Sequence, residues 1–94
     1  MEPMRQQVIR MQQRVNDLLD KPNDPVAGRL RSELQGLEDD LQVGKQANSI
    51  EARVRRIMDI LEGPAKDAQI MNYQHIDMLY DWFDGLLASV QKLR

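Results

Sequence analysis

Apolar residues recur at intervals of three or four positions along almost the whole chain, and this periodicity restricts the possible folds more than any other feature. Such an interval returns side chains to one face of an α-helix. No run alternates apolar and polar residues, and threonine is absent, so no strand is expected. An unbroken seam near the C-terminus consists of Ile76, Leu79, Phe83, Leu86, Val90 and Leu93. The chain is therefore expected to be all-α.

Proline, glycine and capping residues divide the periodic stretches. Asp24 followed by Pro25 is a typical helix start, because the carboxylate caps the first turn and proline fits the first helical position. Gly44 is the expected stop of that helix. Asn48 and Glu51 have the offset of a capping box and predict the next start. The helices are expected at about residues 4–20, 25–43, 49–62 and 66–93.

A chain of 94 residues has the size of one domain, which is assigned here to residues 1–94. Short connections favour antiparallel neighbours, so the expected fold is a small antiparallel four-helix bundle with the C-terminal helix longest. The apolar arc of that last helix is wider than the usual amphipathic stripe. One neighbouring helix would not cover it, so dimerisation is expected to complete the bundle.

The second expected helix contains two features that leave alternatives open. Gly36 either permits the close approach of a neighbouring backbone or is simply tolerated. Glu38, Asp39 and Asp40 form an acidic patch near the helix end, where the helix dipole disfavours acids. We interpret the patch as a solubilising edge, with a contact to Arg or Lys on a partner as the alternative.

Residue types that carry catalysis or bind metals are scarce. The chain has no cysteine and one histidine, His75, which lies beside the apolar seam and is expected to be structural or interfacial. Asp77, Asp81 and Asp84 follow one side of a helix and are interpreted as a solvated face. No nucleophile elbow, zinc motif or phosphate-binding glycine loop is present. We therefore expect no catalysis, cofactor, metal or small-molecule substrate.

The aromatic residues of the chain all lie between positions 73 and 83. Tryptophan and tyrosine are enriched at the centres of protein interfaces. We therefore expect a protein–protein interaction or adaptor module that acts by helix packing, its partner being a second copy, as a homodimer, or another helical protein. The expected contact residues are Tyr73, Met78, Tyr80, Trp82, Phe83 and Leu87.

Two alternatives stay open. The first three expected helices are similar in length and spacing to a three-helix co-chaperone module of the BAG type, which implies a regulator that docks on a large partner such as a chaperone or a polymerase. Its contacts would be Arg53 and Arg56 together with acids of the second helix. The other alternative is a nucleic-acid-associated accessory protein that uses arginines of the first and third helices. A net charge of −2 without a concentrated basic segment does not favour nucleic acid.

The location expected from the sequence is the cytoplasm. The first residues lack the apolar run of a signal peptide, and no stretch approaches the length of an apolar membrane span. We therefore expect no association with a membrane.

Overall fold

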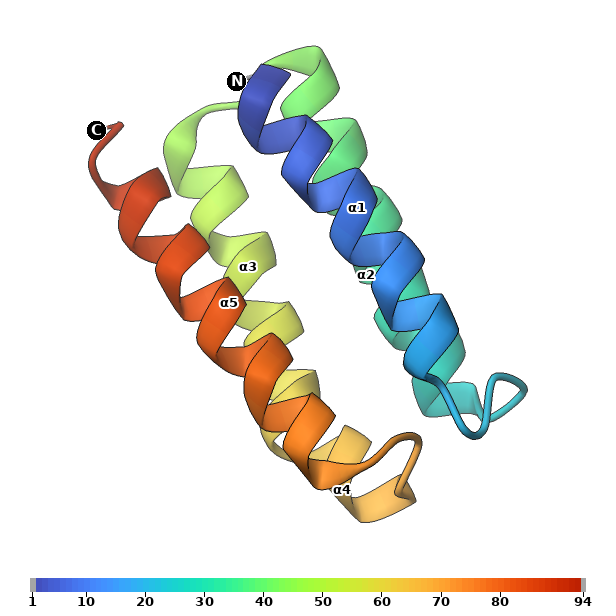
Figure 1. The fold of residues 1–94 in the computed structure, drawn as a ribbon. Helices are drawn as coiled ribbons and strands as arrows, with labels where there is room; N and C mark the ends of the chain where they lie inside the picture. Colours follow the sequence, from blue (N-terminus) through green and yellow to red (C-terminus); the bar gives the residue numbers. More distant parts are fainter. Residues whose placement is uncertain (1, 94) are drawn as a thin grey trace.

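Four long helices and one short helix make up the computed structural model, which describes residues 2–93. They are α1 (Glu2–Leu18), α2 (Pro25–Val43), α3 (Ala47–Glu62), α4 (Pro64–Ala68) and α5 (Tyr73–Gln91). Figure 1 shows α1 beside α2 and α3 beside α5, with α4 at the end of the bundle opposite to that where α1 begins and α5 ends. The bundle measures 35 × 18 × 18 Å. The expected all-α bundle is confirmed.

The helices do not pack equally closely around the core. The backbones of α1 and α2, α2 and α3, and α3 and α5 approach one another closely. The backbones of α1 and α5 approach less closely, although the two helices lie on the same side of the bundle (Figure 1). Side chains must therefore fill more space between α1 and α5 than between the other neighbours.

The apolar seams of the long helices form one core. Phe83 is fully buried, and each buried leucine or isoleucine stabilises the fold by about 1.5–3 kcal/mol relative to an exposed one. The other fully buried large side chains include Leu30, Leu34, Leu37, Ile50, Ile57, Leu61, Ile76 and Leu79. Helix α1 contributes less, because Val8 and Val15 are buried whereas Met4 and Met11 are only partly buried.

Capping residues define both ends of α2. The Asp24 side chain accepts a hydrogen bond from the Val26 amide at 2.8 Å, and Pro25 is the first helical residue. Gly44 ends the helix with φ 72°, a left-handed conformation in which its amide donates to the carbonyls of Asp40 and Leu41. These are the start and stop that the sequence signals indicate.

The expectation of a single helix over residues 66–93 is wrong. The segment splits into α4 and α5, and α5 has 19 residues, the same length as α2, so it is not the longest helix. A continuous helix would extend the seam of Ile76 back to Asn72 and Gln69, which are polar. The break instead allows Ile70 and Met71, adjacent apolar residues, to be buried together.

Hydrogen bonds hold the broken segment in place. Gln69 adopts φ 53° and ends α4, while the Asn72 side chain caps α5 by accepting from the Gln74 amide at 2.7 Å. The Ile70 carbonyl accepts from the amides of Asp20 and Lys21, at 2.8 and 3.3 Å. The link between α4 and α5 is thereby bonded to the link between α1 and α2.

The predicted start of α3 is also corrected. The helix begins at Ala47 with Gln46 as its N-cap residue, and no side chain makes a capping hydrogen bond there. Asn48 is therefore already inside the first turn and exposed, so it does not act as the expected N-cap. Residues 45 and 46 carry the chain out of α2 in a shorter connection than the sequence indicates.

Candidate functional site

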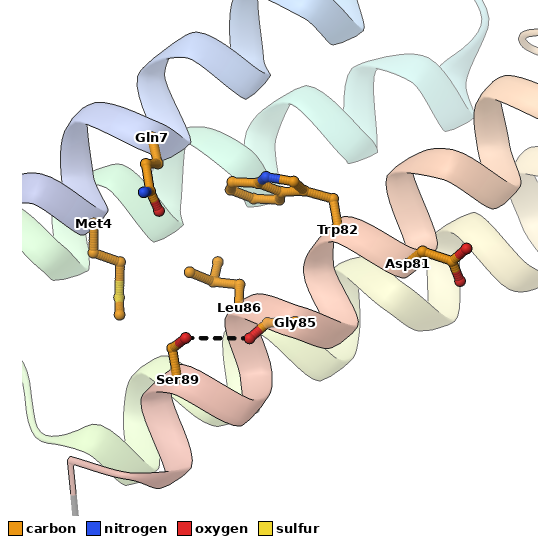
Figure 2. Close-up of a pocket in the computed structure, with 7 residues that line it drawn as sticks. All are labelled: Met4, Gln7, Asp81, Trp82, Gly85, Leu86 and Ser89. Carbon is orange, nitrogen blue, oxygen red and sulfur yellow. Dashed lines mark hydrogen bonds between the residues drawn. The ribbon is translucent and has the colours of Figure 1, made fainter.

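A cleft of about 360 Å³ lies between the first half of α1 and the second half of α5, where the two helices approach less closely. We call it the α1–α5 cleft. Figure 2 shows the Trp82 ring reaching from α5 toward α1, with Met4 and Gln7 extending from α1. Its lining residues are Met4, Gln7, Asp81, Trp82, Gly85, Leu86 and Ser89.

Small residues on α5 create the cleft. A Cβ atom at Gly85 would meet nothing within 4 Å, so no neighbouring side chain occupies the space above it. Ser89, one turn later, is too short to reach α1, and its hydroxyl donates back to the Gly85 carbonyl at 3.3 Å (Figure 2). Trp82 forms one wall and packs edge-to-face on Phe83, with ring centroids 4.9 Å apart.

Accessible apolar side chains are also found beyond both ends of the cleft. Toward the chain ends, a second hollow is lined by Pro3, Met4, Gln7 and Leu93, and Leu93 is 53% exposed. In the other direction, Met78 is 36% exposed, and its sulfur lies 4.0 Å from a guanidinium nitrogen of Arg14 on α1. Accessible apolar side chains therefore border the space between α1 and α5 both within the cleft and beyond its ends.

The structure separates the aromatic residues that the sequence groups together. Phe83 and Leu87 lie in the core, 0% and 7% exposed, so the expectation that they contact a partner is corrected: the broad apolar arc of α5 is mostly covered by its own bundle. Trp82 is half-buried and faces the α1–α5 cleft. Tyr80 lies on the opposite side of α5, in hollows shared with α3 and α4. Tyr73, 52% exposed, donates its hydroxyl to the Lys66 carbonyl on α4 at 3.3 Å.

Sequence reasoning missed the α1 wall and the floor of the cleft. Met4, Gly85 and Ser89 line the cleft, although none of them is among the contact residues expected from the sequence. The available signal was the spacing of Trp82, Gly85 and Ser89, at i, i+3 and i+7, which places two small residues in line with a large one on one helix face.

Arg53 is part of the fold rather than of a free surface. Its guanidinium bonds Glu33 at 2.6 Å and Asp40 at 3.1 Å, and the side chain is 22% exposed. Burial alone would lower the pKa of Arg53, but the hydrogen bonds and charges of Glu33 and Asp40 outweigh it and raise the pKa. The guanidinium is thus occupied within the chain, and the use of Arg53 in docking stays a prediction.

The other arginines of α3 are also paired with acids. Arg56 is exposed and lies 3.3 Å from Glu33, and Arg55 lies 3.7 Å from Glu51. A phosphate would have to compete with these carboxylates, so the cluster does not form a free cationic patch.

The acidic patch of α2 has partners within the chain. Asp40 is 5% exposed and contacts Lys45 at 3.5 Å in addition to Arg53. Glu38 contacts Arg5 of α1 at 3.4 Å. The interpretation as a solubilising edge is therefore wrong for these two acids, which join α2 to its neighbours, while Asp39 is exposed.

Within residues 2–93, no group of three or more histidine, cysteine or acidic residues could hold a metal ion. His75, half-buried on α5, has no such cluster around it. No helix in this part of the chain combines the length and apolar character needed to cross a membrane. No protein-family model matches the chain, and neither curated proteins nor solved structures include a match.

Proposed function

We propose that the chain is a non-catalytic interaction module that binds another helical surface along the α1–α5 cleft. The observation that carries this proposal is the position of Trp82, which is half-buried against Phe83 while its ring borders an open hollow. The neighbouring seam residues of α5 are covered by the bundle, namely Ile76, Leu79, Phe83, Leu86 and Val90. A partner that covers Trp82 would therefore gain contact area that the chain does not use for its own folding.

The chemistry of the cleft suits a protein side chain better than a small polar ligand. Met4, Trp82 and Leu86 supply an apolar surface, and methionine adapts to different shapes. Few polar groups converge on the space, and the Ser89 hydroxyl already donates to a backbone carbonyl. A bulky apolar side chain from a partner helix would displace water from Met4 and Leu86 without requiring new hydrogen bonds.

The rim of the cleft is polar, as expected for a reversible interface. Gln7 lies on the α1 side and Asp81 on the α5 side (Figure 2). An apolar centre with a polar rim is typical of protein interfaces that also exist as separate folded chains. The adaptor role is therefore assigned to the cleft rather than to α5 as a whole.

Site-specific photo-crosslinking tests this proposal. A benzophenone amino acid at Gln7, on the α1 rim of the cleft, should give a discrete protein adduct in the cells that produce the chain, whereas the same amino acid at Ser32, exposed on α2, should not. Ser89→Arg should abolish the Gln7 adduct because the long side chain fills the cleft. Ser49→Arg on α3 is the matched control and should leave it unchanged.

The outcome separates a docking site from incidental contact. An adduct that depends on Ser89 but not on Ser49 supports the cleft as the binding site. Adducts that are equal at Gln7 and Ser32, or that persist in Ser89→Arg, would remove the proposal. Circular dichroism of each variant checks that the helices are intact.

A further inference from the structure

We infer that the occupant of the α1–α5 cleft is a second copy of this chain, related by a two-fold axis parallel to the helices, so that α1 of each copy lies on α5 of the other. This inference rests on the proposed function, because it names the partner for the same cleft. It is carried by the distribution of charge between α1 and α5 and by the register of these helices.

Beside the α1–α5 cleft the exposed charges of α1 and α5 are complementary, although α1 also has exposed acids before and after this stretch, at Glu2 and Asp17. Arg10 and Arg14 of α1 are exposed, and neither forms an ion pair with a carboxylate among residues 2–93. Helix α5 contains Asp77, Asp81 and Asp84 and no lysine or arginine. Asp77 is paired with Lys66 at 3.1 Å, but Asp81, on the rim of the cleft, has no cationic partner in the described chain.

Arg10 and Arg14 lie on the α1 side of the face that contains the α1–α5 cleft. Gln7 lines the cleft and Arg14 contacts Met78 of α5, so both border the space between the helices. Arg10 follows Gln7 by three residues and precedes Arg14 by four, which places it on the same side of α1. One rim of the cleft is therefore basic and the other acidic.

Two identical α1–α5 faces can meet about a two-fold axis that is either perpendicular or parallel to the helices, and the distribution of charge favours one of these arrangements. If the two-fold axis were perpendicular to the helices, α1 would lie on the partner's α1, and an axis that crosses α1 between Arg10 and Arg14 would make arginines face arginines. If the axis is parallel to the helices, α1 lies on the partner's α5 and basic residues face acidic ones. Opposite charges across an interface favour association and fix its orientation, whereas like charges oppose it.

The register brings a specific pair together. Within one chain, Gln7 lines the cleft together with α5 residues between positions 81 and 89, and Arg14 is level with Met78, which it contacts. Arg10 lies between these levels, near Asp81. A two-fold axis parallel to the helices keeps every residue at its own level, so Arg10 comes to face the partner's Asp81, twice in the dimer. Trp82, Met4 and Met78 are then covered at the centre.

Sedimentation equilibrium of the full chain at several concentrations and low salt tests the pairing. We expect a concentration-dependent dimer that dissociates as salt is added. Arg10→Glu should raise the dimer dissociation constant about tenfold, since two symmetric attractions become repulsions. Arg29→Glu makes the same charge change at an exposed site on α2 and should leave the constant unchanged.

Disulfide trapping tests the orientation of the two copies. The chain has no cysteine, so any disulfide must come from the introduced residues. Gln6→Cys on α1 and Gly85→Cys on α5 are made in separate chains, one of them mass-tagged, and mixed under mild oxidation. Both positions are exposed, and a side chain at position 85 meets no neighbouring atom. The inference predicts the mixed disulfide between positions 6 and 85.

Two results would overturn the inference. Symmetric disulfides between like positions would place α1 on α1 and refute the parallel axis, and a monomer at every concentration would refute the second copy. Failure of the second copy is distinct from failure of the proposed function. In a monomeric chain, a Ser89-dependent crosslink from Gln7 to a different protein would still support the cleft as a docking site, whereas no adduct at all would remove both.

Discussion

The guanidinium group of Arg53 on α3 lies directly over Gly36 of α2. A Cβ atom at position 36 would be 2.5 Å from the guanidinium carbon, so only glycine leaves the space that Arg53 occupies. Glu33 and Asp40, which bond this guanidinium, lie three residues before and four residues after Gly36 on the same side of α2. The missing side chain at Gly36 therefore allows the charged side chain of Arg53, rather than a neighbouring backbone, to approach α2 closely.

A double-mutant cycle on this pair should show strong coupling. In the wild-type chain, Gly36→Ala gains about 1 kcal/mol of helix propensity but displaces Arg53 from Glu33 and Asp40, so we expect net destabilisation of about 1 kcal/mol. In an Arg53→Ala background the same substitution displaces nothing and should stabilise. Urea denaturation of the four proteins should give a coupling energy of about 2 kcal/mol. Equal effects of Gly36→Ala in both backgrounds would show that the space above Gly36 is not needed.

The apolar periodicity and the capping, proline and glycine residues predicted most of the fold, but they did not predict which charged residues pair. The seams of α2 and α3 depend on local spacing, and Asp24, Pro25 and Gly44 act through their own backbone. The role of Gly36 depends on a residue seventeen positions away in sequence, and no local signal specifies that distance. The pairing of Asp40 likewise depends on α3 and that of Glu38 on α1, so the local sequence indicates only a solvated edge.

The break between α4 and α5 and the α1–α5 cleft were missed for different reasons. Residues 66–71 have no strong helix stop, because Gln69 rather than glycine takes the left-handed position, so local propensity did not reveal the break. The cleft depends on how closely two helices distant in sequence approach, which periodicity does not determine. The expectation that Trp82 would border an accessible surface stays useful, but Phe83 and Leu87 belong to the core.

Gln69→Gly should stabilise the chain. Gln69 has φ 53°, where a Cβ atom is strained by about 1–2 kcal/mol relative to glycine, and its side chain is exposed. Part of that gain is offset by the greater entropy of glycine in the unfolded chain, so we expect about 0.5–1 kcal/mol from thermal or urea unfolding. Gln13→Gly, at an exposed site within α1, should instead destabilise by about 1 kcal/mol. A loss of stability in Gln69→Gly would contradict the left-handed conformation.

The two asparagines near helix starts should respond differently to alanine. Asn72 caps α5, so Asn72→Ala removes its hydrogen bond to the Gln74 amide and should destabilise by about 1 kcal/mol. Asn48 lies inside the first turn of α3, where alanine has the better helix propensity, so Asn48→Ala should be neutral or slightly stabilising. Chemical denaturation of both variants checks this contrast. A larger loss of stability in Asn48→Ala than in Asn72→Ala would indicate that Asn48 caps α3 and would contradict the helix start in the structure.

The carboxyl group of Glu2 should titrate below its usual range. A hydrogen bond from Gln6 is the main cause of the lowered pKa, and the charge of Arg5 adds to it. Because the pKa is lowered in the folded chain, the contribution of Glu2 to stability is present above its unfolded pKa and is lost as pH falls through the folded value. NMR titration of the Glu2 carboxyl carbon should show the low midpoint, and Gln6→Ala should raise it. A midpoint insensitive to Gln6→Ala would contradict the assigned cause.

The central claim is that a second chain covers the α1–α5 cleft, and fluorescence of Trp82 tests it most directly because Trp82 is the only tryptophan. Emission should shift to shorter wavelength as concentration rises and the indole leaves water. Ser89→Arg should abolish this dependence, while Ser32→Arg should preserve it. Emission that stays constant across a dilution series from dilute to concentrated protein would contradict the claim.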